Sequence, residues 1–305
     1  MKTFYSHGKL LLSGEYVVLD GALALAAPTH AGQWLEIRDA ETDGLRWRSL
    51  GPGGVSWFDT HYRPEELQAP PLQEVLPSDL RGRLRYLLAT ICSLKPDFAD
   101  QFRHTAVETR LEFPREWGLG SSSTLISNLA FWADIDPFLL LKKTFGGSGY
   151  DIAAAREDAP FLYRLGPKGN PEVESIAFTP PFAHALFFVY LNQKQDSREG
   201  ISQYRNRPID REAAVNRISG LTQQMIASTD LDSFCEIMEA HESYIAEVLH
   251  IQPVKERLFP DFPGSVKSLG AWGGDFILAT GRASHQEYFR KKGYPVVKPY
   301  REMIL

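Results

Sequence analysis

Cysteine is almost absent from this chain of 305 residues, and the two that occur, Cys92 and Cys235, lie far apart in the sequence. Neither belongs to a Cys-x-x-Cys pair or has histidines at the spacing of a metal site. We therefore expect buried thiols, with neither a disulfide framework nor a zinc site. Two isolated thiols are typical of a protein that is kept in a reducing compartment.

The sequence also lacks a surplus of basic residues and a long apolar run. Its formal net charge is −5, and no cluster of Lys and Arg with interleaved aromatics occurs, so we expect no nucleic-acid partner. Residues 10–28 end in Ala24-Leu-Ala-Ala27, as a secretory signal can, but Glu15 and Asp20 interrupt them. No other segment reaches transmembrane length. We therefore expect no membrane association and a cytoplasmic location.

Three familiar catalytic motifs are missing as well. No Lys-Ser or Lys-Thr closes a Walker loop, and no Gly-x-Gly-x-x-Gly occurs where a glycine loop precedes a helical pattern. No Gly-x-Ser-x-Gly elbow is present, and no histidine is linked to the serines by spacing. These absences exclude a P-loop nucleotidase, a dinucleotide-binding fold and a serine hydrolase.

The chain contains enough apolar residues, 43%, to bury a substantial core and to form two domains. The turn cluster 166–171 is the best candidate boundary, which gives domains of 1–165 and 166–305. The order of the elements favours an α+β fold. Apolar patterns predict strands at 9–19, 34–37, 105–111, 161–165, 185–191, 265–269, 276–280 and near 296, and helices at 83–94, 122–133, 137–144, 211–228, 231–250 and 284–292, with a short helix from 151.

The most informative segment runs from Phe113 to Thr124 and reads Phe-Pro-Arg-Glu-Trp-Gly-Leu-Gly-Ser-Ser-Ser-Thr. Glycines let a backbone approach a ligand closely, and the free N–H groups at the start of the following helix attract anions. We therefore expect a phosphate cradle formed by Gly118, Leu119, Gly120, Ser121, Ser122 and Ser123. An ordinary helix that is capped by a serine is the alternative.

Three other segments occur in an order that resembles a known family. They are Gly8-Lys9-Leu-Leu-Leu-Ser-Gly14-Glu15-Tyr16, Gly146-Gly-Ser-Gly-Tyr-Asp151 and Ser268-Leu-Gly-Ala-Trp-Gly-Gly-Asp275. Together with the cradle, they resemble the motifs of the GHMP kinases and, within them, of the mevalonate kinase and phosphomevalonate kinase branch. The resemblance implies an N-terminal ATP-binding domain with a left-handed β-α-β unit, of the ribosomal protein type, and a C-terminal ferredoxin-like α/β sandwich.

The resemblance also implies roles for single residues. Asp151 matches the catalytic aspartate that accepts the proton of the attacking hydroxyl, and Lys9 matches the lysine beside it. Ser122 matches the serine that binds Mg²⁺, and ATP is the implied phosphoryl donor. The chain departs from mevalonate kinases at Leu140, because they commonly have a glutamate there as a second magnesium ligand. Asp134, Asp136 or a water molecule could take its place.

Further expectations concern the rest of the site. Residues 270–274 of motif three, which spans 268–275, should form a turn between two strands that leans on the phosphate loop or on the substrate, although a simple hairpin turn is the alternative. Basic side chains after the strand at 185–191 could bind an anionic acceptor or could be solvated: Lys194, Arg198 and Arg205. Trp57 and Phe58 could flank adenine or pack in the core.

We therefore expect an ATP-dependent kinase that phosphorylates a small anionic metabolite of the isoprenoid pathway. Mevalonate ranks first and phosphomevalonate second. A diphosphomevalonate decarboxylase-like enzyme and a non-catalytic sensor on the same scaffold are the alternatives from other classes. The oligomeric state stays open, with a homodimer among the alternatives.

Overall fold

The computed structural model describes residues 1–68, 76–166, 169–195, 197–272 and 274–305. These residues form two compact units. Unit 1 comprises 1–8, 31–115 and 120–156, and unit 2 comprises 9–30, 116–119 and 157–305. Three elements contribute residues to both units: β1 (Lys2–Ser13), β2 (Ala24–Asp39) and the 3-10 helix η4 (Arg115–Trp117). In the part of the chain that the structure describes, no helix is long and apolar enough to cross a membrane.

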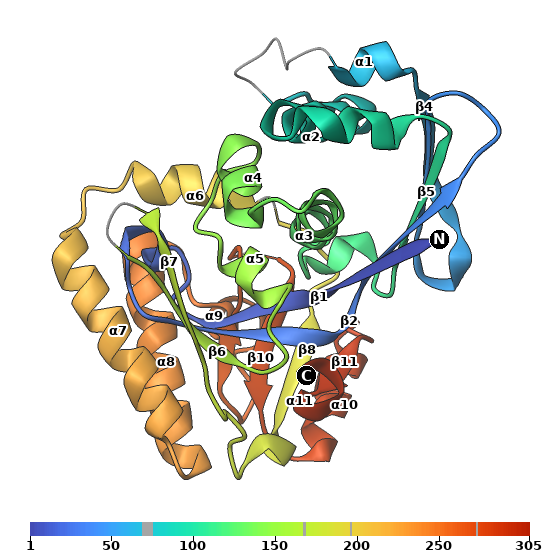
Figure 1. The fold of residues 1–305 in the computed structure, drawn as a ribbon. Helices are drawn as coiled ribbons and strands as arrows, with labels where there is room; N and C mark the ends of the chain where they lie inside the picture. The colour runs from blue at the N-terminus through green and yellow to red at the C-terminus, as the bar shows by residue number, and fades with distance from the viewer. Residues whose placement is uncertain (69–75, 167–168, 196, 273) are drawn as a thin grey trace. The chain divides into compact units, whose positions relative to one another are not determined.

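Unit 1 is built on strands β3 (Leu45–Leu50), β4 (Ser56–Tyr62) and β5 (Thr105–Leu111) together with the second half of β2. The strand order is β4-β3-β5-β2. β3 pairs antiparallel with β4 and parallel with β5, and β5 pairs antiparallel with β2. Its helices are α1 (Pro64–Gln68), α2 (Leu80–Leu94), α3 (Ser121–Ala133), α4 (Pro137–Lys143) and α5 (Tyr150–Ala154), with 3-10 turns η2 (Pro52–Gly54) and η3 (Pro96–Phe102) (Figure 1).

The core of unit 1 lies between this sheet and its helices. Apolar side chains from β2, β3 and β5 meet those of α2 and α3, because each element carries its apolar residues on one face. The aromatic rings of Phe98, Phe102 and Trp132 pack edge to face in this core. The start of α4 is set by Asp136, whose side chain accepts a hydrogen bond from the Phe138 N–H, with Pro137 in the first turn as the sequence predicts.

The elements that lie wholly in unit 2 are β6 (Phe161–Leu165), β7 (Pro171–Ser175), β8 (Leu186–Tyr190), β9 (Val266–Ser268), β10 (Phe276–Thr280), β11 (Val297–Pro299), α6 (Ser197–Arg205), α7 (Arg211–Ala227), α8 (Leu231–Leu249), α9 (Val254–Leu258), α10 (Ala283–Lys291), α11 (Tyr300–Met303), η1 (Val17–Asp20) and η6 (Ala183–Ala185). Four of these strands form an antiparallel sheet in the order β11-β8-β10-β9. Helices α7 and α8 lie side by side, and α10 lies beside β11 (Figure 1). The first half of β2 pairs with β6, and β6 pairs with β7.

Most elements that the sequence predicts are present. The predicted ranges 105–111 and 161–165 coincide with β5 and β6, and the helices predicted at 122–133, 137–144 and 211–228 match α3, α4 and α7 to within one residue. The structure has a mixed α/β architecture with two sheets, in agreement with the predicted α+β class. The finer description of the two domains and their division at 165/166 stay predictions, and residues 167 and 168 of that turn cluster lie outside the described residues.

One predicted strand is wrong in its second half. The expected strand at 9–19 ends at Ser13, because Gly14 takes a left-handed conformation with φ of 100° and the 3-10 helix η1 follows. The apolar run through Val17 and Val18 gave no sign of this turn. Strands β3 and β4 were missed, although residues 45–50 alternate between buried and exposed side chains for most of their length.

Candidate active site

The first glycine of the predicted cradle lies beside the strand that carries Lys9. The backbone N–H of Lys9 donates a hydrogen bond of 3.0 Å to the carbonyl oxygen of Leu119, and all these residues belong to unit 2. Gly118 has a left-handed backbone with φ of 66°. Unit 2 thus brings the lysine of motif one to the start of the predicted cradle.

Motif three also lies beside Gly118, at the start of the predicted cradle. β9 and β10 pair with each other and the Leu269 N–H donates to the Phe276 carbonyl oxygen, so the predicted turn between two strands is present; Gly273 lies outside the described residues. A Cβ atom on Gly118 would lie 2.4–2.6 Å from the carboxyl group of Asp275. Only glycine therefore fits at position 118 without a shift of this carboxylate.

Asp275 is the acidic group at this point, and sequence reasoning gave it no role. Burial raises the pKa of the Asp275 carboxyl, while the positive charges of Lys9 and Lys194 and a hydrogen bond of 3.3 Å from the Gln195 N–H lower it. The sequence contained a signal for this residue, namely an aspartate at the end of a glycine-rich turn. Burial of a carboxylate is costly without a partner, so such an aspartate indicates a nearby cation or hydrogen-bond donor.

The second half of the cradle lies in unit 1, at the start of α3. Its N-cap is Gly120 with φ of 89°, and among the described residues no side chain caps this end. Ser123 is buried and its hydroxyl donates back to the Gly120 carbonyl oxygen at 2.8 Å, whereas the Ser122 side chain is exposed. A serine therefore does not cap α3, and the role of the loop as a phosphate cradle stays a prediction. The first N–H groups of the helix have no intrahelical acceptor, as an anion site requires.

Buried polar contacts fix α3 in unit 1. The Thr124 hydroxyl donates to the Gln33 side-chain oxygen at 2.7 Å, and the Asn128 amide donates to the Gln33 carbonyl oxygen at 2.9 Å. The Ser6 hydroxyl donates to the Asn128 side-chain oxygen at 2.8 Å. Because these groups are buried and paired, α3 is held in one position against β1 and β2.

Asp151 lies in the first turn of α5, after a left-handed Gly149 with φ of 90°. It is half-buried, and α5 packs against α3 within unit 1. The end of α5 is tied to β1, since the His7 N–H donates to the Ala155 carbonyl oxygen at 3.2 Å. Unit 1 therefore carries the Ser122 hydroxyl and the Asp151 carboxylate on two helices in contact.

The carboxylates considered for a second magnesium ligand are placed elsewhere in unit 1. Leu140 is fully buried in the core. Asp134 is the C-cap of the 13-residue helix α3, about 20 Å from its first turn, and its side chain is 95% exposed beside Lys95. Asp136 caps α4. Among the described residues, no group of three or more His, Cys, Asp or Glu side chains could hold a metal ion.

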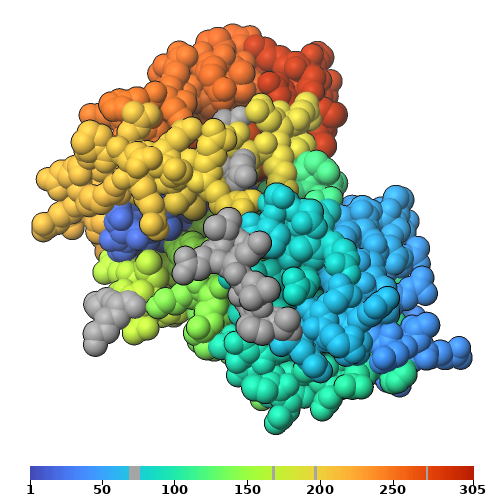
Figure 2. Space-filling view, turned by 90° about the horizontal axis from the view of Figure 1, so that it is seen from above, coloured from blue at the N-terminus to red at the C-terminus, as the bar shows by residue number. Residues whose placement is uncertain are grey.

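The side chains proposed for adenine and acceptor binding have these positions. The Arg115 guanidinium lies 3.9 Å from the centre of the Trp57 ring, and Phe58 packs partly against the core of unit 1. Lys194, Arg198 and Arg205 are exposed in unit 2. α6, which carries both arginines, packs against α8 and forms part of the yellow surface in Figure 2. The adenine and acceptor contacts stay predictions.

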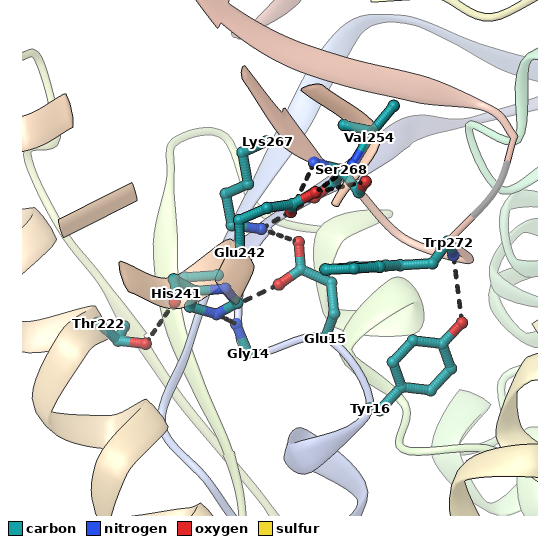
Figure 3. Close-up of polar contacts among 11 residues, drawn as sticks. Gly14, Glu15, Tyr16, Thr222, His241, Glu242, Val254, Lys267, Ser268 and Trp272 are labelled. Atoms are coloured by element: carbon teal, nitrogen blue, oxygen red, sulfur yellow. Dashed lines mark hydrogen bonds and ion pairs between the residues drawn. The ribbon is translucent and has the colours of Figure 1, made fainter. Parts of the chain in front are cut away.

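A buried ionic network behind motif one was not predicted. Glu15 and Lys267 are both 0% exposed, and the Lys267 ammonium donates to Glu15 Oε1 (Figure 3). His241 Nε2 lies 3.4 Å from Glu15 Oε2 and accepts a hydrogen bond of 3.1 Å from the Gly14 N–H. Burial raises the pKa of Glu15 and lowers that of His241. This network fixes the turn at which motif one leaves β1.

Glu242 of α8 completes the network. Its carboxyl oxygens accept hydrogen bonds from the Ser268 N–H and hydroxyl, each at 2.9 Å, and from the Val254 N–H at 3.3 Å. Burial raises the pKa of Glu242 to about 7, although Lys267 and these hydrogen bonds oppose the shift. In the unfolded chain the group has a pKa near 4.5.

The raised pKa of Glu242 predicts that the protein loses stability as pH rises. Between pH of about 4.5 and 7 the folded state binds the extra proton, so the free energy of unfolding should fall by up to about 3 kcal/mol across this window. Urea unfolding of the wild type and of Glu242→Gln at several pH values measures the difference. The variant should show a flatter profile, and two parallel profiles would contradict the assignment.

The fold is similar to that of several solved small-molecule kinases. No protein-family model and no curated protein matches the sequence. Among solved structures, the chain is similar to phosphomevalonate kinase from Streptococcus pneumoniae in complex with phosphomevalonate and AMPPNP, with 18% identity, 96% of each chain covered and a TM-score of 0.68. It is similar to Methanococcus jannaschii mevalonate kinase, with 14% identity, coverage of 95% and 94%, and a TM-score of 0.68.

A third similar structure is Lactococcus lactis galactokinase complexed with galactose. The two sequences are 14% identical, the similarity covers 95% of this chain and 88% of the galactokinase chain, and the TM-score is 0.66. The resemblance that the motifs indicate is thus confirmed in the fold, over nearly the full length of these kinases.

Proposed function

We propose that the protein is an ATP-dependent kinase that transfers the γ-phosphoryl group to a small anionic acceptor of the isoprenoid pathway, with mevalonate as the first candidate. The observation that carries the proposal is the meeting of three motifs in unit 2, where Lys9, Gly118 and Asp275 lie together. Phosphoryl transfer needs a held triphosphate, neutralised charge and an acceptor in line, and this chain has candidates for each task.

The N–H groups of the loop 118–123 would hold the β- and γ-phosphates. Ser122, which is exposed in the first turn of α3, would hold Mg²⁺ together with the nucleotide, because magnesium usually binds one or two side chains plus substrate phosphates. When bound, the ion would neutralise charge on the phosphates. The Lys9 ammonium would stabilise charge on the transferred group.

Asp151 would accept the proton of the acceptor hydroxyl. Its position in the first turn of α5 favours the carboxylate form, and the Gly149 before it lets a ligand come close. A base in hydrogen-bond reach of the attacking hydroxyl is worth about 10²- to 10⁴-fold in rate.

Phosphomevalonate is the second candidate acceptor. The favouring observation is the similarity to the Streptococcus pneumoniae enzyme, whose structure contains phosphomevalonate and AMPPNP. Lys194, Arg198 and Arg205 could bind a carboxylate or phosphate of either acceptor.

An assay for ATP consumption over mevalonate, phosphomevalonate, homoserine and galactose would test the proposal. It should score phosphorylated product and carbon dioxide separately. We expect phosphorylation of mevalonate or phosphomevalonate without gas release. Carbon dioxide would indicate a decarboxylase, and a lack of ATP consumption with every acceptor would favour a sensor.

A further inference from the structure

The backbone of Asp275 is held in an uncommon conformation by hydrogen bonds on both sides of the peptide. Asp275 has φ of 54°, a left-handed conformation that is uncommon for a residue with a side chain. Its N–H donates to the Gln193 carbonyl oxygen at 2.6 Å, and its carbonyl oxygen accepts from the Leu191 N–H at 2.8 Å. Such strain persists only where the surroundings enforce it, and it is found most often at functional sites.

The position of this carboxylate needs an explanation. It lies against Gly118, at the start of a loop that we expect to bind a triphosphate, and two anions in one half-buried place repel each other. A cation between them removes the repulsion. Lys9 is a cation on this side, because its charge acts on Asp275 and its own N–H is bonded to Leu119.

We propose that Asp275 is a positioning residue that holds the ammonium group of Lys9 at the start of the phosphate loop. The inference rests on the proposed kinase function and adds a residue to it. A lysine side chain is a flexible point charge with about 2 kcal/mol of rotamer entropy. A carboxylate on a rigid backbone holds the Lys9 side chain in place before the nucleotide binds. Less side-chain entropy is then lost when the transition state forms.

The first test measures Lys9 itself, without any acceptor. Acetic anhydride modifies only unprotonated amines, and a neighbouring carboxylate keeps an amine protonated. Peptide mass spectrometry should show Lys9 acetylated about fivefold to tenfold faster in Asp275→Asn than in the wild type, since loss of about 1 kcal/mol of pairing corresponds to this factor. Glu116→Gln removes an equal charge from an exposed residue of η4, directly before this loop, and should change the rate less than about twofold.

The same measurement separates the two proposals. Mg-ATP should protect Lys9 from acetylation in the wild type, and absence of protection would count against the nucleotide site and hence the proposed function. Protection together with an unchanged Lys9 rate in Asp275→Asn would overturn only the positioning role. An unchanged rate with a weaker effect of Mg²⁺ on ATP affinity would also overturn it, because Asp275 would then act on the metal.

The second test is a double-mutant cycle in turnover. Asp275→Asn should lower kcat by about tenfold or more when Lys9 is present, with KM for ATP nearly constant, and by less than about threefold in a Lys9→Met background. Additive losses would overturn the proposal. If Asp275→Asn does not fold, Asp275→Glu and Asp275→Gln form an equal-sized pair that differs in charge, and Lys9 should be acetylated faster in the Gln variant.

Discussion

Asp151→Asn should abolish most phosphoryl transfer, with a loss in kcat of about 10²- to 10⁴-fold, while ATP affinity changes less than about threefold. The asparagine has nearly the same shape but cannot take up the proton of the acceptor hydroxyl. ATP affinity should persist because the proposed contacts to the triphosphate come from the loop 118–123 and not from this carboxylate. Calorimetric titration with Mg-ATP and a coupled turnover assay measure the two effects separately.

Asp134→Asn is the matched control. It removes the same charge from the opposite end of α3, where the side chain is 95% exposed, and it should alter turnover by less than about twofold. Unchanged turnover in Asp151→Asn would remove this residue from the mechanism. An equal loss of ATP affinity and turnover would instead assign Asp151 to nucleotide binding.

Local patterns predicted the parts of the fold that short-range physics decides. The loop before α3 was recognised from its glycines and serines, and Asp136 with Pro137 marked the start of α4 correctly. The end of β1 was missed because the bend at Gly14 is supported by His241, more than two hundred residues later in the chain. A single sequence without that partner gives an apolar run that looks like a continuous strand.

The same reason explains why Asp275 and Lys267 were overlooked. Each lies in motif three or next to it. Asp275 contacts Gly118 and Lys267 contacts Glu15, and both partners are distant in the sequence. Pattern reasoning predicts which residue types suit a phosphate site. It does not predict which charged side chains become buried opposite each other, since that depends on tertiary packing.

Loss of one partner of the buried pair Glu15 and Lys267 should strongly lower the free energy of unfolding of unit 2, where the pair lies beside motif one (Figure 3). Lys267→Met would leave the Glu15 carboxylate buried with no ammonium group, at a cost of about 3–5 kcal/mol in the free energy of unfolding. Urea unfolding at pH 8 measures this loss. Because burial already raises the pKa of Glu15, the variant should recover part of its stability at lower pH, where Glu15 takes up a proton in the folded state.

A double variant tests whether the loss comes from the pair or from packing. Adding Glu15→Gln to Lys267→Met removes the buried charge, so the double variant should be more stable than Lys267→Met alone at pH 8 and should lose most of the pH dependence that this single variant adds to that of the wild type. His241 stays beside residue 15 in both variants, and burial lowers the pKa of its imidazole, so it adds no compensating positive charge at this pH. Additive destabilisation at both pH values would show that Lys267 acts through its packing, and that the turn at Gly14 is held by hydrogen bonds instead of by charge.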